Sequence, residues 1–178
     1  MNLLTTIREL FQHMEWADAL VWQTVAVSDA ALEDEDLRAR LLHIHTVQRA
    51  FLRIWQERPL NPSVGNDLGG AALAAWGQEY HQEVAQYLSE MDEADLDRPV
   101  TLPWAEFIAA RIGRQPETPT LGETLLQVAS HSGYHRGQVN TRLRELGAEP
   151  PLVDFIAWIW LGKPAAQWRR SIEVDIVQ

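Results

Sequence analysis

The sequence predicts an all-α protein, namely a four-helix bundle with a crossover loop and a short additional C-terminal helix. Apolar residues recur with a helical period in four long segments, and glycine and proline collect between those segments. The chain has 178 residues, of which 46% are hydrophobic and 22% are charged. This size and composition are typical of one globular domain with its own core, so we expect a single helical domain over residues 1–178.

The first two helices are expected at residues 3–27 and 36–57. In the first, apolar side chains recur every three or four residues from Leu3 to Val25. Residues 28–36 are acidic and polar, and we expect them to form a turn that makes the two helices antiparallel neighbours. The acidic residues near the start of the second helix interact favourably with the positive end of its dipole.

The third helix is expected at residues 71–91. It follows a crossover loop, residues 58–70, which contains two prolines and three glycines. Leu73, Trp76 and Tyr80 begin an apolar stripe along this helix. The long loop allows a crossover topology.

The fourth helix is expected at residues 120–146. Thr120 and Glu123 have the spacing of a capping box, and Gly147 is a typical residue just after a helix end. Paired prolines then precede a short, very apolar helix at residues 152–161. We expect the polar tail beyond that helix to pack loosely.

Residues 98–119 are irregular, and the sequence leaves their structure open. Residues 100–102 are compatible with a short strand, and residues 104–112 with a helical turn or a second strand. Pro116 and Pro119 exclude a long helix through this segment.

The composition excludes several classes of function. The chain has no cysteine, which excludes disulfide scaffolds, iron–sulfur clusters, cysteine-ligated zinc and cysteine nucleophiles. Its net charge of −10 is repelled by phosphate backbones, so we expect no nucleic-acid partner. No apolar run is long enough to span a membrane, and the first residues do not resemble a secretory signal. We therefore expect a soluble, cytoplasmic protein without a membrane partner.

His131 and His135 are four residues apart in the expected fourth helix. Residues with this spacing lie on the same helix face, so both imidazoles can bind one cation. Imidazole suits Zn, Ni and Fe. The same spacing also occurs in pairs of surface histidines, so the pair alone does not establish a metal site.

His43 and His45 lie on opposite flanks of the apolar stripe of the second helix. Two residues apart on a helix, they cannot easily bind the same ion, and periodicity does not choose between them. Gln48 lies near the middle of this stripe, where a buried amide needs partners, so it is a candidate for bonding a ligand histidine or lining a pocket. The single histidines His13 and His81 are expected to have structural roles.

Four features of the chain resemble the DinB/YfiT-like family of metal-dependent bundle proteins over nearly its whole length. They are the opening LFQHMEWADALVW, the segment LLHIHTVQRAFL, the signature HSGYHRGQV, and the apolar helix after paired prolines. The signature is the specific feature, because the fourth helix of that family carries an HxxxHRGQ run.

The resemblance implies a metal ion held by three histidines. Two of them match His131 and His135, and the third comes from the second helix. The spacing in the family places an acidic or amide residue five positions after that histidine and an aromatic residue eight positions after it. His43 fits, with Gln48 and Phe51 at these positions, and His45 is the alternative.

The resemblance also implies a function. A divalent transition metal (Zn, Ni or Fe) on three histidines keeps open positions for a small-molecule substrate. Some relatives resemble transferases or isomerases that use a low-molecular-weight thiol, and a chain without cysteine would take its thiol from the substrate. The alternative is a non-catalytic, metal-binding, stress-associated protein. A homodimer is expected. Arg136, next to His135, is expected to be a solvated or dimer-contact residue, with steering of an anionic substrate as the alternative. Gln138 is expected to bond a ligand histidine or a neighbouring helix.

Overall fold

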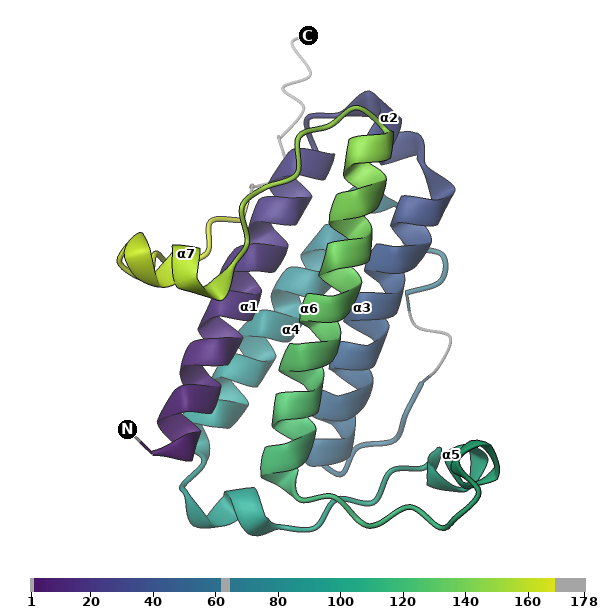
Figure 1. The fold of residues 1–178 in the computed structure, drawn as a ribbon, viewed down its shortest axis with the longest axis vertical. Helices are drawn as coiled ribbons and strands as arrows, with labels where there is room; N and C mark the ends of the chain where they lie inside the picture. Colours follow the sequence, from purple (N-terminus) through teal and green to yellow (C-terminus); the bar gives the residue numbers. More distant parts are fainter. Residues whose placement is uncertain (1, 62–64, 169–178) are drawn as a thin grey trace, which may run out of the picture.

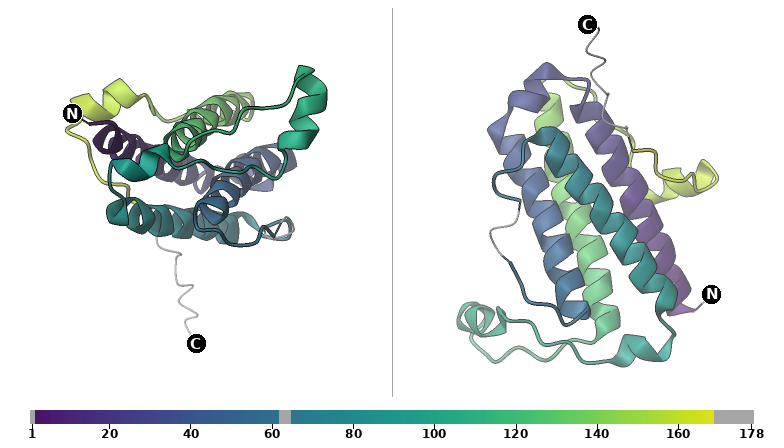
Figure 2. Two further views of the ribbon diagram at one scale, coloured as in Figure 1. Left: turned by 90° about the horizontal axis from the view of Figure 1, so that it is seen from below. Right: turned by 180° about the vertical axis from the view of Figure 1, so that it is seen from behind.

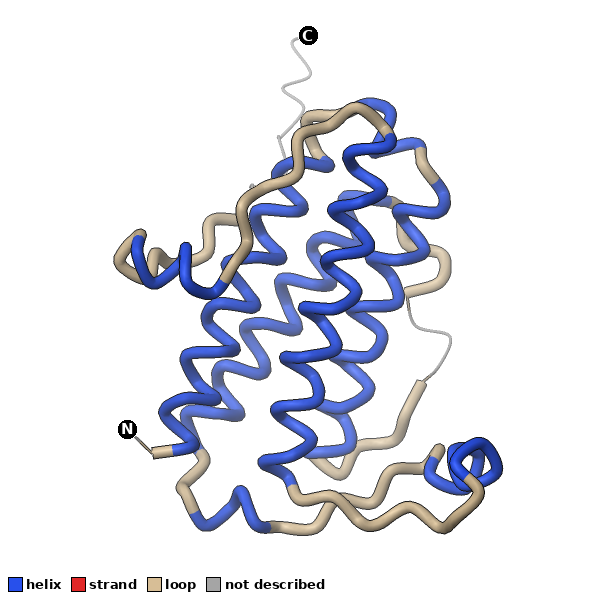
Figure 3. Tube along the Cα trace, viewed as in Figure 1, coloured by secondary structure: helices blue, strands red, loops and turns tan. Residues whose placement is uncertain are grey.

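The computed structural model describes residues 2–61 and 65–168 of the chain. Within these residues the regular secondary structure is helical (Figure 3). One isolated β-bridge joins Pro99 and Thr120. The expected all-α class is therefore confirmed for this part of the chain. No helix within it is both long enough and apolar enough to cross a membrane.

Four long helices lie alongside one another and form the body of the molecule (Figure 1). They are α1 (Leu3–Val25), α3 (Glu35–Trp55), α4 (Gly70–Glu90) and α6 (Leu121–Glu145). Each overlaps one of the long helices that periodicity predicts, and no end differs by more than two residues. α1 and α6 run in one direction, and α3 and α4 run in the other (Figures 1 and 2). The connection from α3 to α4 therefore returns along the length of the molecule.

The remaining helices are short. They are α2 (Asp29–Glu33), the 3-10 helix η1 (Ala94–Asp97), α5 (Ala105–Ile112) and α7 (Phe155–Trp160). The prediction of a plain turn over residues 28–36 was wrong, because α2 forms there. The side chain of Ser28 accepts a hydrogen bond from the backbone N–H of Ala31, so the polar residue that suggested a turn is the N-cap of this helix.

The segment that the sequence left open, residues 98–119, contains α5 and one side of the β-bridge. The backbone N–H of Val100 donates to Pro119, and that of Leu121 donates to Arg98. Among the described residues this contact is a single bridge, so residues 100–102 do not form a strand. Each residue of α5 is at least partly exposed. The segment is therefore determined by few contacts, which explains the weak sequence signal.

The C-terminal segment is more ordered than expected as far as residue 168. α7 begins at Phe155 rather than near residue 152. After α7, Lys163 forms an ion pair with Glu9 at 2.6 Å, and the indole N–H of Trp168 donates to Glu15 at 3.2 Å. These contacts attach the start of the tail to α1. The rest of the expected loose tail, residues 169–178, lies outside the described residues.

The interior of the described residues has three apolar clusters. The smallest consists of Trp16, Ala17 and Trp158, and a polar layer lies between the two larger ones. One cluster includes Ile7, Phe11, Trp55, Tyr80 and Leu125, and the other includes Val21, Leu37, Ile44, Leu73 and Val139. The buried polar residues of the layer are Asp18, His45, Gln48, His81, Ser132 and Arg136. Each long helix contributes to both larger clusters and to this layer, so the helices pack around one continuous interior.

Candidate metal centre

Three histidines from two helices gather at one point between α3 and α6. They are His43 on α3 and His131 and His135 on α6. One nitrogen of each ring lies within 4.8 Å of the nitrogens of the other two. The ring centroid of His43 lies 5.1 Å from that of His131 and 4.5 Å from that of His135, and the two α6 rings are 4.3 Å apart. A three-histidine group that could hold a metal ion is therefore present.

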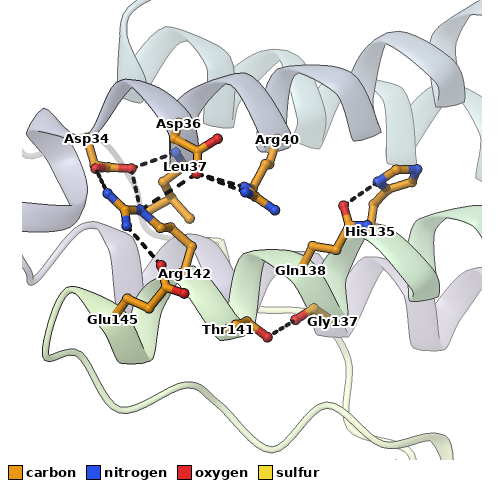
Figure 4. A network of polar contacts seen from close by, with 10 residues as sticks. All are labelled: Asp34, Asp36, Leu37, Arg40, His135, Gly137, Gln138, Thr141, Arg142 and Glu145. Carbon is orange, nitrogen blue, oxygen red and sulfur yellow. Dashed lines mark hydrogen bonds and ion pairs between the residues drawn. The ribbon is translucent and has the colours of Figure 1, made fainter.

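The packing of α3 against α6 produces this arrangement. Asp34 is the N-cap of α3, and its two carboxylate oxygens accept hydrogen bonds from Arg142 of α6 at 3.1 and 2.6 Å (Figure 4). This two-point contact joins the start of α3 to the last turns of α6. Since the helices are antiparallel, the middle of α3 then lies beside the middle of α6, where His131 and His135 share one face.

The hydrogen bonds of the α6 histidines leave nitrogens available for an ion. Nδ1 of His135 donates to Oε1 of Gln138 at 2.9 Å, which leaves the Nε2 lone pair free to act as a ligand (Figure 4). Nδ1 of His131 is buried, with no hydrogen-bond partner among the described residues. A buried nitrogen without a partner is unfavourable unless something binds it. This nitrogen is therefore evidence from the structure, independent of the family resemblance, that the histidine group fits a metal ion.

The surroundings of His43 and His131 favour the neutral form of these two imidazoles. Burial, followed by the neighbouring His135 and His43, lowers the pKa of His131 to about 4. Burial and His135 also lower the pKa of His43. Only the neutral form of imidazole has the lone pair that binds a metal ion, so these shifts favour metal binding down to mildly acidic pH.

His45, the alternative ligand, lies in the interior and outside this cluster. Its Nε2 accepts a hydrogen bond from the indole N–H of Trp22 at 2.9 Å, and its Nδ1 lies 2.8 Å from Oε1 of Gln48. The ring also packs against Gly77, where a Cβ would lie 2.5 Å from it. Both nitrogens therefore have protein partners, and of the two α3 histidines the structure brings only His43 to the α6 pair.

Comparison with known proteins identifies the family. The DinB family model matches residues 1–170. This chain belongs to the DinB family. No curated protein matches the chain.

Two residues of this DinB chain have partners other than those expected. Arg136 was expected to be solvated or to contact a second subunit, and this was wrong, because it is buried and forms an ion pair with Asp18. Arg136 follows His135 directly, and successive side chains are about 100° apart around a helix. Arg136 therefore points in a different direction from His135, into the interior. Gln48 is buried, but its amide bonds His45, Asp18 and Ser132 rather than a histidine of the cluster.

A buried polar network centred on Asp18 was not predicted from the sequence. The carboxylate accepts hydrogen bonds from Arg136 and, at 3.0 Å each, from Gln48 and His81. Asp18 lies four residues after Met14 within the apolar stripe of α1, and this position was the available signal. An acidic residue on a buried stripe requires partners, so the position itself predicts a polar interior.

A cavity of about 450 Å³ lies between α5 and the adjoining ends of α3 and α6. Phe51 and Trp104 form aromatic walls, with ring centroids 5.3 Å apart. Gln127 also lines it and lies one helical turn before His131 on the same face of α6. In this DinB-family chain a cavity therefore begins about one turn from the histidine cluster.

Proposed function

We propose that this chain is a metal-dependent enzyme in which His43, His131 and His135 hold one divalent transition-metal ion, Zn, Ni or Fe. The observation that carries the proposal is the convergence of three imidazoles from α3 and α6, one of which has a buried nitrogen that lacks a partner among the described residues. We also propose that the chain is one DinB-like four-helix bundle domain with an added short helix. The arrangement of the four long helices and the family match over residues 1–170 support this.

When bound, such an ion would polarise a ligand or acidify a water or thiol at its open positions. The residues of the chain would prepare the site. Oε1 of Gln138 accepts a hydrogen bond from Nδ1–H of His135, which holds the ring in place and leaves Nε2 available as a ligand. Burial keeps His131 neutral. The aromatic cavity one turn away offers space for the apolar part of a substrate.

We propose a thiol-dependent transferase or isomerase reaction with a small-molecule substrate. The chain has no cysteine, so a thiol that reaches the cluster must come from a co-substrate. Thiolate is a strong ligand for Zn, Ni and Fe, and binding to the ion would lower the pKa of the thiol. Membership of the DinB family supports this reaction class through the resemblance described above.

Metal analysis of the purified protein tests the site. We expect about one ion per chain in the wild type and a loss of about tenfold or more in affinity in His131→Ala, because one of three ligands is missing. His13→Gln is the matched control, since His13 is buried but bonds the carbonyl of Val153 away from the cluster. An ion that binds equally to wild type and His131→Ala excludes this site. Thiol-dependent turnover that is lost in His131→Ala and kept in His13→Gln supports the reaction.

We also propose that the protein forms a homodimer. Large apolar side chains on and beside α7 are exposed, including Ile156, Trp160 and Leu161, and such surface favours association. Sedimentation equilibrium tests this, with a dimer mass expected for the wild type and a weaker dimer for Trp160→Ser. A monomer for the wild type at all concentrations excludes the dimer. The cytoplasmic location and the absence of a nucleic-acid partner stay predictions.

A further inference from the structure

A second cavity lies between α1 and α4, outside the helix pair that carries the histidine cluster. Its volume is about 330 Å³, which is enough for a small organic molecule. α1 and α4 pack side by side along their length, as the rear view in Figure 2 shows. Phe11, Val84 and Leu88 give the cavity apolar walls, while His81, Glu15 and Arg8 are polar groups that line it.

His81 presents an unused hydrogen-bond acceptor. The ring is 1% exposed, and its Nε2 lies 3.0 Å from Oδ2 of Asp18. Asp18 is paired with the guanidinium of Arg136, so its carboxylate accepts and Nε2 of His81 donates. In the neutral ring Nδ1 of His81 then carries a lone pair, and this atom is buried without a partner in the part of the chain that the structure describes. A bound donor would satisfy it.

The charges in the cavity indicate what kind of donor fits. Glu15 lines the cavity together with His81, and the indole of Trp168, which donates to Glu15, has its ring centroid 5.7 Å from that of His81. A carboxylate and an aromatic ring near an imidazole lone pair suit a cation that has N–H donors. Among the described residues, the other charged group lining the cavity is Arg8, seven residues from Glu15 along α1, or about 10 Å of helix. Arg8 already donates to the carbonyls of Leu88 and Met91.

We propose that this cavity binds a small organic ammonium ion. The ammonium group donates to Nδ1 of His81 and to the carboxylate of Glu15, and a short alkyl chain packs against Phe11 and Val84. The site uses no residue of the histidine cluster, so it does not depend on the proposed metal-dependent activity.

The direct test follows the ring nitrogens of His81 by nitrogen NMR while n-butylammonium is added to the full-length protein. We expect saturable binding and a shift of the Nδ1 signal, because that nitrogen gains a hydrogen bond, with a dissociation constant below about 10 mM. Butyrate, which has the same chain length and the opposite charge, should leave the signal unchanged. An Nδ1 signal that does not respond to n-butylammonium overturns the proposal and leaves solvent as the occupant of the cavity.

A charge-neutral variant provides the second test. Glu15→Gln keeps an oxygen that accepts from Trp168 but removes the negative charge, so n-butylammonium should bind about tenfold more weakly. Glu83→Gln is the matched control, because Glu83 is a partly exposed carboxylate on α4 that pairs with Arg49 instead of lining the cavity. Equal affinity in wild type and Glu15→Gln, or equal loss in both variants, overturns the proposal.

Discussion

At the scale of single residues, Asp18 determines the chemistry of the interior. Burial alone raises the pKa of this carboxyl, but the charge of Arg136 and the hydrogen bond of His81 lower it more, so the pKa lies well below its usual range. The carboxylate is therefore ionised at neutral pH and compensates a guanidinium that is as deeply buried as itself. Removing one partner of such a pair costs far more than removing both.

We expect Asp18→Asn to lower the free energy of unfolding by about 3–5 kcal/mol, because the charge of Arg136 is left buried without compensation. Urea denaturation measures this loss. Asp36→Asn is the matched control, since Asp36 pairs with Arg40 at an exposed site and should lose less than about 1 kcal/mol. The double variant Asp18→Asn with Arg136→Met should regain part of the loss. A cost for Asp18→Asn as small as that of the control would contradict this account.

The folded structure lowers the pKa of four histidines, His13, His43, His45 and His131, and this makes the stability of the metal-free protein depend on pH. Burial is the largest cause that lowers the pKa of His131 and of His45 from 6.5 to about 4 each. The folded chain therefore binds fewer protons than the unfolded chain between these values, so stability is complete above about 6.5 and falls as the pH drops towards 4. We expect the urea midpoint to fall between about pH 7 and about pH 5, where carboxylates stay ionised.

The variant His131→Ala checks the assignment. Without one of these groups, the midpoint should fall less steeply over the same pH range. The control His13→Gln leaves His131 and His45 in place. Burial also lowers the pKa of His13, so this variant should reduce the slope, but by less than His131→Ala does. A midpoint that does not change with pH in the wild type would show that none of these pKa values is lowered in the folded state.

Sequence reasoning reached the three histidines of the cluster but not the interior network. The spacing of His131 and His135 determines that they share a face, and the family resemblance favoured His43 over His45. Their role as ligands stays a prediction. The prediction for Arg136 was wrong for two reasons. A shift of one residue along a helix can move a side chain from an exposed position to a buried one, and Asp18, the partner of Arg136, is 118 residues away in the sequence. Contacts of such separation have no local signal.

At the scale of elements, the start of α6 is held by a complete capping box. The side chain of Thr120 accepts from the backbone N–H of Glu123, and the side chain of Glu123 accepts from that of Thr120. We expect Thr120→Ala to lower the free energy of unfolding by about 1 kcal/mol. Thr141→Ala is the control within the same helix, because Thr141 is exposed and alanine is the better helix former, so stability should stay the same or rise. Equal losses in the two variants would show that the cap contributes nothing specific.

The elements differ in how well their sequences predict them. Long helices with an apolar stripe bury that stripe in the interior. The same apolar residues that make these helices recognisable in the sequence therefore also stabilise them. α5 has no buried residue, and α2 has only one, Ala31. These short helices are stabilised mainly by local capping and turn interactions. They have too few residues for a helical period of apolar side chains to be recognised in the sequence. This is why residues 98–119 stayed open and α2 was mistaken for a turn.

At the scale of the whole molecule, an ion on the histidine cluster would join α3 to α6. A ligand that binds only the folded state stabilises it, by about 2.7 kcal/mol at a hundred times the dissociation constant. We expect Zn to raise the melting temperature of the chelator-treated wild type and to leave that of His43→Ala nearly unchanged. A rise of equal size in both proteins would indicate binding elsewhere. A large rise without thiol-dependent turnover would favour the non-catalytic alternative.

Helix α6 carries two kinds of chemistry on neighbouring residues. His131 and His135 belong to the cluster with His43, while Ser132 and Arg136, one position further on, bond Gln48 and Asp18 in the interior. Both sets share one stiff backbone, so α6 cannot turn about its axis to improve one set without displacing the other. Exchanging the ion on the histidine cluster for a larger or smaller one should therefore alter the carboxylate stretching frequency of Asp18, although that ion does not contact Asp18. Infrared spectroscopy of one buried aspartate could in this way distinguish metals held by imidazoles outside the core.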